Sequence, residues 1–180
     1  MFYLLVDEEI SLKLGTVRDA EALFTIIDHA RGELRTFLPW VDEMTSVEDT
    51  ANYLQQSLTG FAQGNVLTAI IYCHGMMCGV AGYNQLDQKH RTAQIGYWLI
   101  PEFQGRGIAT KGAAALTTEA FNSENMYRVE IRAAVENVNS LAVPERLGFV
   151  KEGTLRGVEH VHGTFLDHVV YSTLASEWRS

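Results

Sequence analysis

The segment with the clearest chemical signature is a glycine turn, Gln104-Gly105-Arg106-Gly107-Ile108-Ala109-Thr110, which follows an apolar β-like run and precedes an alanine-rich stretch. Two glycines allow the backbone to turn with its amides facing inward. The unpaired amides and the dipole of a helix start attract anions. Arg106 and the following Lys111 add positive charge. The turn therefore predicts a binding site for a diphosphate.

The same residues have simpler interpretations. A single G-x-G is also typical of a plain tight turn. The P-loop pattern G-x-x-x-x-G-K-[ST] is absent. The dinucleotide pattern G-x-G-x-x-G fails because position 110 is Thr, and the turn follows antiparallel strands rather than the first strand of a Rossmann unit.

The elements around this turn alternate in type. Ser46 and Asp49 form an N-terminal capping pattern for a helix with apolar residues at positions 47, 51, 54, 58 and 61. Further helices are predicted at 19–30, 108–121 and 140–147, and strands at 10–14, 66–73, 76–86, 92–100, 129–135, 149–153 and 165–174. The three strands between 66 and 100 read as an antiparallel meander. This order predicts a mixed α/β sheet with helices on both faces.

Bulk properties exclude several classes of protein. The 180 residues carry a formal net charge of -8 without a Lys/Arg-rich run, so a nucleic-acid partner is not expected and a cationic amine substrate is favoured. The two cysteines do not form a zinc or disulfide pattern. No apolar run approaches the roughly 20 residues of a membrane span. We predict one domain over residues 1–180, in the cytoplasm, with no membrane partner.

A family resemblance strengthens the diphosphate interpretation. Gln104, Gly107 and Ala109 fill the fixed positions of the acyl-CoA motif [QR]-x-x-G-x-[GA], and the chain here resembles the GNAT acetyltransferases. A second set of matches is similar to the RimJ/RimL-type enzymes that acetylate the N-termini of ribosomal proteins. It comprises Leu38-Pro39-Trp40, Asn137-Val138-Asn139-Ser140, Leu147-Gly148-Phe149, Glu152-Gly153, the segment 167–171 and Trp178.

The resemblance implies a fold, a cofactor and a binding site. The GNAT fold is a mixed, mostly antiparallel sheet, here expected to be seven-stranded, with a splayed central strand pair. Acetyl-CoA would lie in that gap, with its diphosphate on the amides of residues 104–110. Its pantetheine arm would bond to the strand backbone at Trp98, Leu99 and Ile100, and Asn137 would bond the pantetheine amide. The alternative for Asn137 is a loop turn residue.

The resemblance also suggests a proton donor. Ser140 matches the family serine near the CoA sulfur, although a serine just before a helix is also a natural N-cap. Tyr97 is a competing donor, with a core or cross-strand role as its alternative.

The base is assigned from strand geometry. Glu130 is expected to act through water at the border of the cleft, but Arg132 points to the same face and would neutralise it. Glu102 is the second choice, and its alternative is a favourable contact with a helix dipole.

Of all parts of the reaction, the sequence determines the acceptor substrate least. Phe37 and Trp40 are candidates for its pocket, or are packing residues. We predict N-acetylation of the N-terminal α-amine of a protein, with ribosomal proteins as the first candidates, by direct attack in a ternary complex. A small amine (polyamine or aminoglycoside) and a non-catalytic acyl-CoA-binding module are the alternatives. No metal is expected despite His160, His162 and His168, and a homodimer or higher homo-oligomer is an open alternative.

Overall fold

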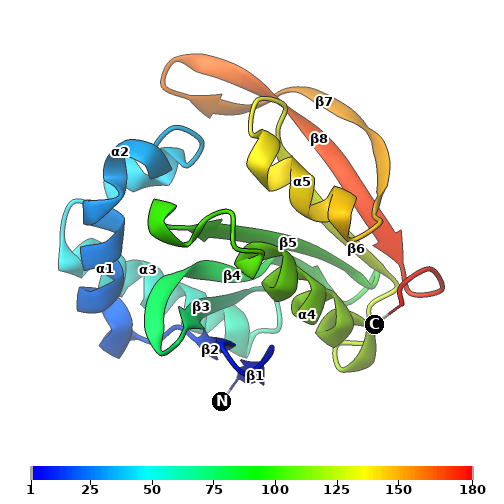
Figure 1. Cartoon of the computed structure of the whole chain (residues 1–180), viewed down its shortest axis with the longest axis horizontal. Helices are drawn as coiled ribbons and strands as arrows, with labels where there is room; N and C mark the ends of the chain where they lie inside the picture. The colour runs from blue at the N-terminus through cyan, green and yellow to red at the C-terminus, as the bar shows by residue number, and fades with distance from the viewer. Residues whose placement is uncertain (1, 180) are drawn as a thin grey trace.

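A computed structural model describes residues 2–179, and its eight strands form one sheet in the order β1-β2-β3-β4-β5-β6-β8-β7 (Figure 1). The strands are β1 (Tyr3–Leu5), β2 (Ile10–Leu14), β3 (Leu67–Cys73), β4 (Met76–Asp87), β5 (Thr92–Leu99), β6 (Arg128–Ala134), β7 (Val150–Val161) and β8 (Thr164–Leu174). The expected meander is confirmed, since β3, β4 and β5 pair antiparallel in sequence order.

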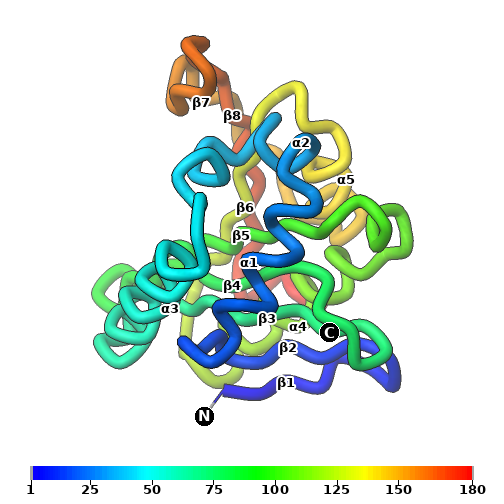
Figure 2. The backbone as a smooth tube through the Cα atoms, turned by 90° about the vertical axis from the view of Figure 1, so that its left-hand side faces the viewer, coloured from blue at the N-terminus to red at the C-terminus, as the bar shows by residue number. Residues whose placement is uncertain are grey.

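Helices cover both faces of the sheet, as expected. They are α1 (Ala20–His29), α2 (Arg31–Leu34), α3 (Val47–Ala62), α4 (Ile108–Asn122) and α5 (Val138–Arg146), with short 3-10 turns η1 (Val17–Asp19), η2 (Pro39–Glu43) and η3 (Pro101–Phe103). Figure 2 shows α1 and α3 in front of the sheet and α4 behind it. None of the helices within residues 2–179 combines the length and apolar character needed for a membrane crossing.

The expected strand count of seven is wrong, because β1 adds an eighth strand at the edge. It pairs antiparallel with β2, from Tyr3 opposite Lys13 to Leu5 opposite Ser11. β1 has only three residues, and its apolar Tyr3 and Leu5 are exposed. A strand this short gives no alternating pattern in the sequence, and only its partner strand defines it.

The central strand pair is splayed, as the resemblance implied. β5 and β6 run parallel and pair only from Thr92 opposite Arg128 to Ile95 opposite Ile131. Beyond these positions β5 stays paired with β4 as far as Leu99, while β6 stays paired with β8 as far as Ala134. The two halves of the sheet therefore separate along the second half of β5.

Local signals position the helix that borders one side of this gap. The predicted cap of α3 is present: Ser46 Oγ accepts a 3.2 Å hydrogen bond from the Asp49 amide. The Asp49 carboxylate accepts hydrogen bonds from the Thr45 amide and from the Thr45 and Ser46 hydroxyls. Leu54 of this helix is fully buried, and it anchors the apolar face of α3 on the sheet.

Candidate active site

Two pockets meet at the splayed strands. The first, of about 870 Å³, is lined by the glycine turn, the start of α4 and residues of α5, and we call it the α4-side pocket. The second, of about 800 Å³, is lined by Asn52, Tyr53 and Gln56 of α3 and by η2, and we call it the α3-side pocket. Six residues line both pockets: Phe37, Leu38, Tyr97, Trp98, Asn137 and Ser140. The two pockets therefore adjoin at these residues.

The glycine turn has the geometry that an anion site requires. Gly105 and Gly107 have φ values of 71° and 76°, in the left-handed region that favours glycine. Gly107 is the N-cap of α4, and the Lys111 amide donates to the Gly107 carbonyl at 2.9 Å. The amides of Ile108, Ala109 and Thr110 precede this first helical bond and have no acceptor inside the helix. All three residues line the α4-side pocket.

The positive charges near this turn are arranged differently from the sequence-based expectation. Lys111 lines the α4-side pocket, but its Nζ lies 2.7 Å from Asp7, and this contact lowers the pKa of Asp7 to about 2. The Arg106 guanidinium lies 5.2 Å from the centre of the Phe103 ring. Arg146 of α5 lines the pocket and is exposed. Sequence reasoning did not assign Arg146 a cofactor role, although it directly precedes the Leu147-Gly148-Phe149 match.

The backbone of β5 is only partly available to a ligand in the gap. The Gln104 side chain donates to the Leu99 carbonyl at 2.8 Å, and the Ile100 amide donates to the Cys78 carbonyl at 3.0 Å. The Trp98 carbonyl faces β4, where a side chain on Gly79 would lie 2.1 Å from it. Because main-chain groups alternate in direction along a strand, the polar groups of Tyr97 and Leu99 face the gap.

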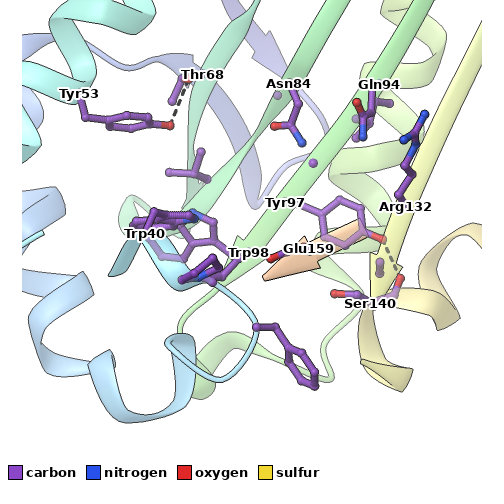
Figure 3. Close-up of a pocket in the computed structure, with 18 of the residues that line it drawn as sticks. Trp40, Tyr53, Thr68, Asn84, Gln94, Tyr97, Trp98, Arg132, Ser140 and Glu159 are labelled. Carbon is purple, nitrogen blue, oxygen red and sulfur yellow. Dashed lines mark hydrogen bonds between the residues drawn. The ribbon is translucent and has the colours of Figure 1, made fainter. Parts of the chain in front are cut away.

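Tyr97 and Ser140 join the two separated halves of the sheet (Figure 3). The Tyr97 hydroxyl donates to the main-chain carbonyl of Ser140 at 2.7 Å. Burial raises the pKa of Tyr97 well above its ordinary value. The phenol is a neutral donor already engaged with a carbonyl.

The cap of α5 corrects one alternative for Ser140. Asn137 is the N-cap, and its side chain accepts from the Ser140 amide at 3.4 Å. Ser140 is therefore the third helical residue and not the cap, because α5 begins at Val138, two residues earlier than expected. Its hydroxyl lies in the first turn of α5, at the junction of the two pockets.

Aromatic rings form one wall of the α3-side pocket. The rings of Trp40 and Tyr53 are nearly parallel, with centroids 6.5 Å apart, and Trp40 lies 5.9 Å from Trp98 at 50°. Phe37 lines the same pocket. The structure thus brings together Phe37, Trp40 and Trp98, three residues singled out from the sequence, and adds Tyr53 from α3. Tyr53 was missed because its helical spacing places it outside the apolar stripe of α3.

A bulge in β4 directs an amide toward the same pocket. Tyr83 pairs with Ile95 and Gln85 with Gln94, so Asn84 is the extra residue. A side chain on Gly96 would lie 2.4 Å from the Asn84 amide nitrogen, which shows that Asn84 lies across β5 at Gly96. Asn84 and Gln94 both line the α3-side pocket (Figure 3).

Three carboxylates line the α3-side pocket. Glu43 is exposed, and Asp49 is engaged by the helix cap described above. Glu159 on β7 has a side chain that is 29% exposed, and its Oε2 lies 2.5 Å from His168 Nε2. That nitrogen is buried and has no well-aligned hydrogen bond among residues 2–179. Neither Glu159 nor His168 was assigned a role from the sequence.

The predicted base, Glu130, lies between two arginines. Arg128 donates to its carboxylate at 2.6 Å, and Arg132 also donates to it. Arg132 lines the α3-side pocket, whereas Glu130 is not among the lining residues of either pocket within residues 2–179. Glu102, the second choice, pairs with His29 at 2.8 Å on the surface. The base role of Glu130 stays a prediction.

The histidines near the C-terminus have separate surroundings. His160 lies against the Phe165 ring, with centroids 4.8 Å apart, and His168 faces Glu159. Within the part of the chain that the structure describes, no three His, Cys, Asp or Glu side chains gather as metal ligands would.

The fold and the paired pockets are those of an acyl-group transferase. Residues 11–150 match the family of acetyltransferase (GNAT) domains, and because this match covers well over half of the chain, the chain belongs to that family. It is an acetyltransferase with the GNAT fold, as the sequence motifs indicated.

Similar proteins place it near the ribosomal-protein enzymes, in agreement with the second motif set. YdaF of Bacillus subtilis (strain 168), which its name assigns provisionally to ribosomal N-acetylation, is 37% identical over 99% of this chain and 98% of its own. The ribosomal-protein-serine acetyltransferase of Escherichia coli (strain K12) is 28% identical over 94% of both chains. A structure of RimL, the ribosomal L7/L12 alpha-N-protein acetyltransferase, in complex with coenzyme A has a TM-score of 0.93 at 28% identity and covers 96% of this chain and 98% of that one.

Proposed function

We propose that this enzyme transfers the acetyl group of acetyl-CoA to the N-terminal α-amine of a protein, with ribosomal proteins as the first candidates. The observation that carries the proposal is the meeting of two pockets at Tyr97, Trp98, Asn137 and Ser140. One pocket has the features of a diphosphate site, and the other has an aromatic and acidic lining. Acetyl donor and amine acceptor can therefore meet at a single point from opposite sides.

The α4-side pocket fits acetyl-CoA. The amides of residues 108–110 would bind the diphosphate, with Arg146 and the Asp7-paired Lys111 nearby. The gap-facing main-chain groups of Tyr97 and the Leu99 amide would bond the pantetheine amides as a neighbouring strand would. Asn139 of α5 also lines this pocket. The acetyl thioester would then lie near Ser140.

The position of the two cysteines supports direct attack within a ternary complex. Both cysteines, Cys73 and Cys78, are buried, and neither lines either pocket within residues 2–179. Burial raises the pKa of the Cys78 thiol to about 12, so it is a poor nucleophile. The amine would therefore attack the thioester carbonyl itself, without an enzyme thioester.

Ser140 would stabilise the CoA thiolate as it departs. Its hydroxyl can donate a proton or a hydrogen bond to the CoA sulfur as the C–S bond breaks. Its position in the first turn of α5 adds the positive end of the helix dipole, which stabilises a developing negative charge. Tyr97 would hold Ser140 in place through the bond to its carbonyl.

Glu159 is the carboxylate best placed to accept the amine proton, directly or through water. It is half-buried, it lines the α3-side pocket, and its Oε2 lies 2.5 Å from His168 Nε2. A free α-amine has a pKa of about 7.7–8.0, so a useful fraction is neutral near pH 7, and the base contributes by positioning and by removing the proton after attack.

The lining of the α3-side pocket suits the end of a polypeptide. Glu43 and Glu159 attract an ammonium group, and the rings of Trp40 and Trp98 can stack on the first side chains. The Asn84 and Gln94 amides can bond peptide groups. Such an acceptor would be met in the cytoplasm. The sequence-based alternative of a homodimer or higher homo-oligomer stays a prediction.

The test is mass spectrometry of acceptors after incubation with isotope-labelled acetyl-CoA. Purified ribosomal proteins and peptides copying their N-termini would be compared with polyamines and aminoglycosides. We expect label on the α-amine of a peptide or protein. Label confined to small amines would replace the proposed acceptor class, and CoA binding with no labelled product in either panel would indicate a non-catalytic module.

A further inference from the structure

The α3-side pocket contains one cationic side chain in an otherwise acidic lining. Glu43, Asp49 and Glu159 supply negative charge. Among the lining residues within 2–179, Arg132 is the single lysine or arginine. It follows Ile131, the last residue of β6 that pairs with β5. Arg132 therefore lies where the two halves of the sheet begin to separate.

The Arg132 guanidinium is held at one edge and available at the other. Its Nε donates to Glu130, and this is its one hydrogen bond among residues 2–179. A guanidinium has five N–H donors, so the four on its two Nη atoms remain for a ligand. Arg128 donates to the other oxygen of Glu130 at 2.6 Å, which fixes the carboxylate that positions Arg132. The Arg132 side chain is 34% exposed, so a ligand in the pocket can reach it.

Two side-chain amides lie on the strands next to Arg132. Gln94 of β5 is half-buried and Asn84 of β4 is exposed, and both line the α3-side pocket. Figure 3 shows Asn84, Gln94 and Arg132 in a row across β4, β5 and β6, with Tyr97 and Ser140 below them. We call Asn84, Gln94 and Arg132 the arginine end of the pocket. Its amide and guanidinium groups are all donors that suit an anion.

The strand β5 connects the arginine end to the place where the two pockets meet. Gln94, Gly96 and Trp98 share one face of β5, because side chains alternate along a strand. Trp98 lines both pockets, and Gln94 lies four residues away, about 13 Å along the strand at about 3.3 Å per residue. An extended peptide advances by the same rise, and side chains from both molecules shorten the gap. A chain with its α-amine near Ser140 would therefore bring its second to fourth residues to the arginine end.

We propose that the arginine end binds a carboxylate of the acceptor, carried by an aspartate or glutamate among its second to fourth residues. The Nη groups of Arg132 would donate to both carboxylate oxygens, and the Gln94 and Asn84 amides would donate beside them. This inference rests on the proposed peptide acceptor. The preferred substrate is then an N-terminus with an acidic residue shortly after the α-amine. A polyamine is disfavoured, because Arg132 repels its second ammonium group.

The test uses peptides that differ in charge at one position. Each peptide has a free α-amine, an amidated C-terminus, no lysine, and either aspartate or asparagine at position 2, 3 or 4. In wild type we expect the Asp-to-Asn ratio of kcat/KM to reach about tenfold or more at one of these positions, the scale of hydrogen bonds to a charged group. Added salt should lower this ratio, because the site is partly exposed. A ratio near one at all three positions would overturn the proposal.

Variants of Arg132 assign the preference to this residue. Arg132→Gln should bring the ratio to about one, and Arg132→Lys, which keeps the charge without the planar fork, should give an intermediate ratio. The matched control is Arg18→Gln, an exposed arginine outside the lining of both pockets, which should keep the wild-type ratio. Both peptides are measured on the same enzyme, so a smaller folded fraction cancels in the ratio. If Arg132→Gln does not fold, Arg132→Lys decides, and a wild-type ratio in the folded Arg132 variant contradicts the proposal.

Failure of this inference and failure of the proposed function give different results. Equal acetylation of aspartate and asparagine peptides by wild type keeps the peptide acceptor and overturns the arginine end. Acetylation of small amines but of no peptide removes the proposed acceptor class. The comparison is then made between a linear amino acid, with amine and carboxylate at opposite ends, and its amide. A preference for the acid that is lost in Arg132→Gln would support the carboxylate site, and equal rates would overturn it.

Discussion

The Tyr97 hydroxyl donates its hydrogen bond to the one carbonyl of α5 that Pro144 leaves without its helical donor. In a regular helix the amide of residue 144 would bond to the carbonyl of Ser140, four residues earlier, but proline has no N–H. The Tyr97 side chain supplies a donor at 2.7 Å instead. A missing helical bond thus becomes a connection between β5 and α5 across the splayed strands, next to the proposed proton donor.

This relationship predicts coupling between Tyr97 and Pro144. Tyr97→Phe should destabilise the fold by about 1–3 kcal/mol, because a part-buried carbonyl loses its partner. Pro144→Ala restores the amide, so Tyr97→Phe should cost less in that background. Chemical denaturation of the two single variants and the double variant gives the coupling energy. Strict additivity would show that the two groups do not share the Ser140 carbonyl.

Gly107→Val should weaken acetyl-CoA binding without unfolding the protein. A Cβ atom added at Gly107 meets nothing within 4 Å, but the φ of 76° is unfavourable for a β-branched residue, so the amides of the turn must shift. Gly64→Val is the matched control, with φ 72°, the same open surroundings and a position at the end of α3. Calorimetric titration should show loss of affinity only for Gly107→Val. Equal affinities of the two variants would remove the glycine turn from the cofactor site.

Ser140→Ala should lower kcat more than it raises the KM for acetyl-CoA, because the hydroxyl acts on the sulfur after the cofactor is bound. A fall of about 10²-fold is the scale of one lost proton-transfer or hydrogen-bonding group. Asn139→Ala on the same helical turn lines only the α4-side pocket and should mainly raise KM. Wild-type kcat in Ser140→Ala would exclude Ser140 from the mechanism.

Glu159→Gln and Glu130→Gln test the two assignments of the base against each other. We expect Glu159→Gln to lower kcat/KM by about 10²-fold or more, because the proton acceptor is lost. Glu130→Gln should release Arg128 and Arg132 and act mainly on stability. The reverse result, with kcat/KM lowered by about 10²-fold only in Glu130→Gln at unchanged stability, would restore the sequence-based assignment.

The Glu152 carboxylate should make the stability of the folded protein depend on pH. Arg128 and the Ser172 hydroxyl donate to it, which lowers its pKa from the usual 4.5 to about 2. The pKa of Glu152 is lower in the folded protein than in the unfolded chain. The stabilising effect of the ionised carboxylate is therefore complete above pH 4.5 and is lost as pH falls toward 2. The difference in melting temperature between wild type and Glu152→Gln should therefore shrink across that range. A difference independent of pH would contradict the assigned pKa.

Much of the fold was predictable because its signals are local. The cap of α3 depends on Ser46 and Asp49, three residues apart, and the glycine turn on two residues with positive φ. The three-residue strand β1 was missed because only its pairing with a partner strand defines it. The early start of α5 at Val138 was missed because an asparagine cap sets it, without a periodic pattern of apolar residues.

By itself, the sequence determined the order of most elements, the glycine turn and the family motifs, since each depends on residues close together in the chain. Only the tertiary structure decided which side chains share the site. The Tyr97 bond to Ser140 spans 43 residues, and a bulge directs Asn84 across Gly96. Such contacts depend on strand register and on how far the two halves of the sheet separate, and these follow from packing of the whole chain.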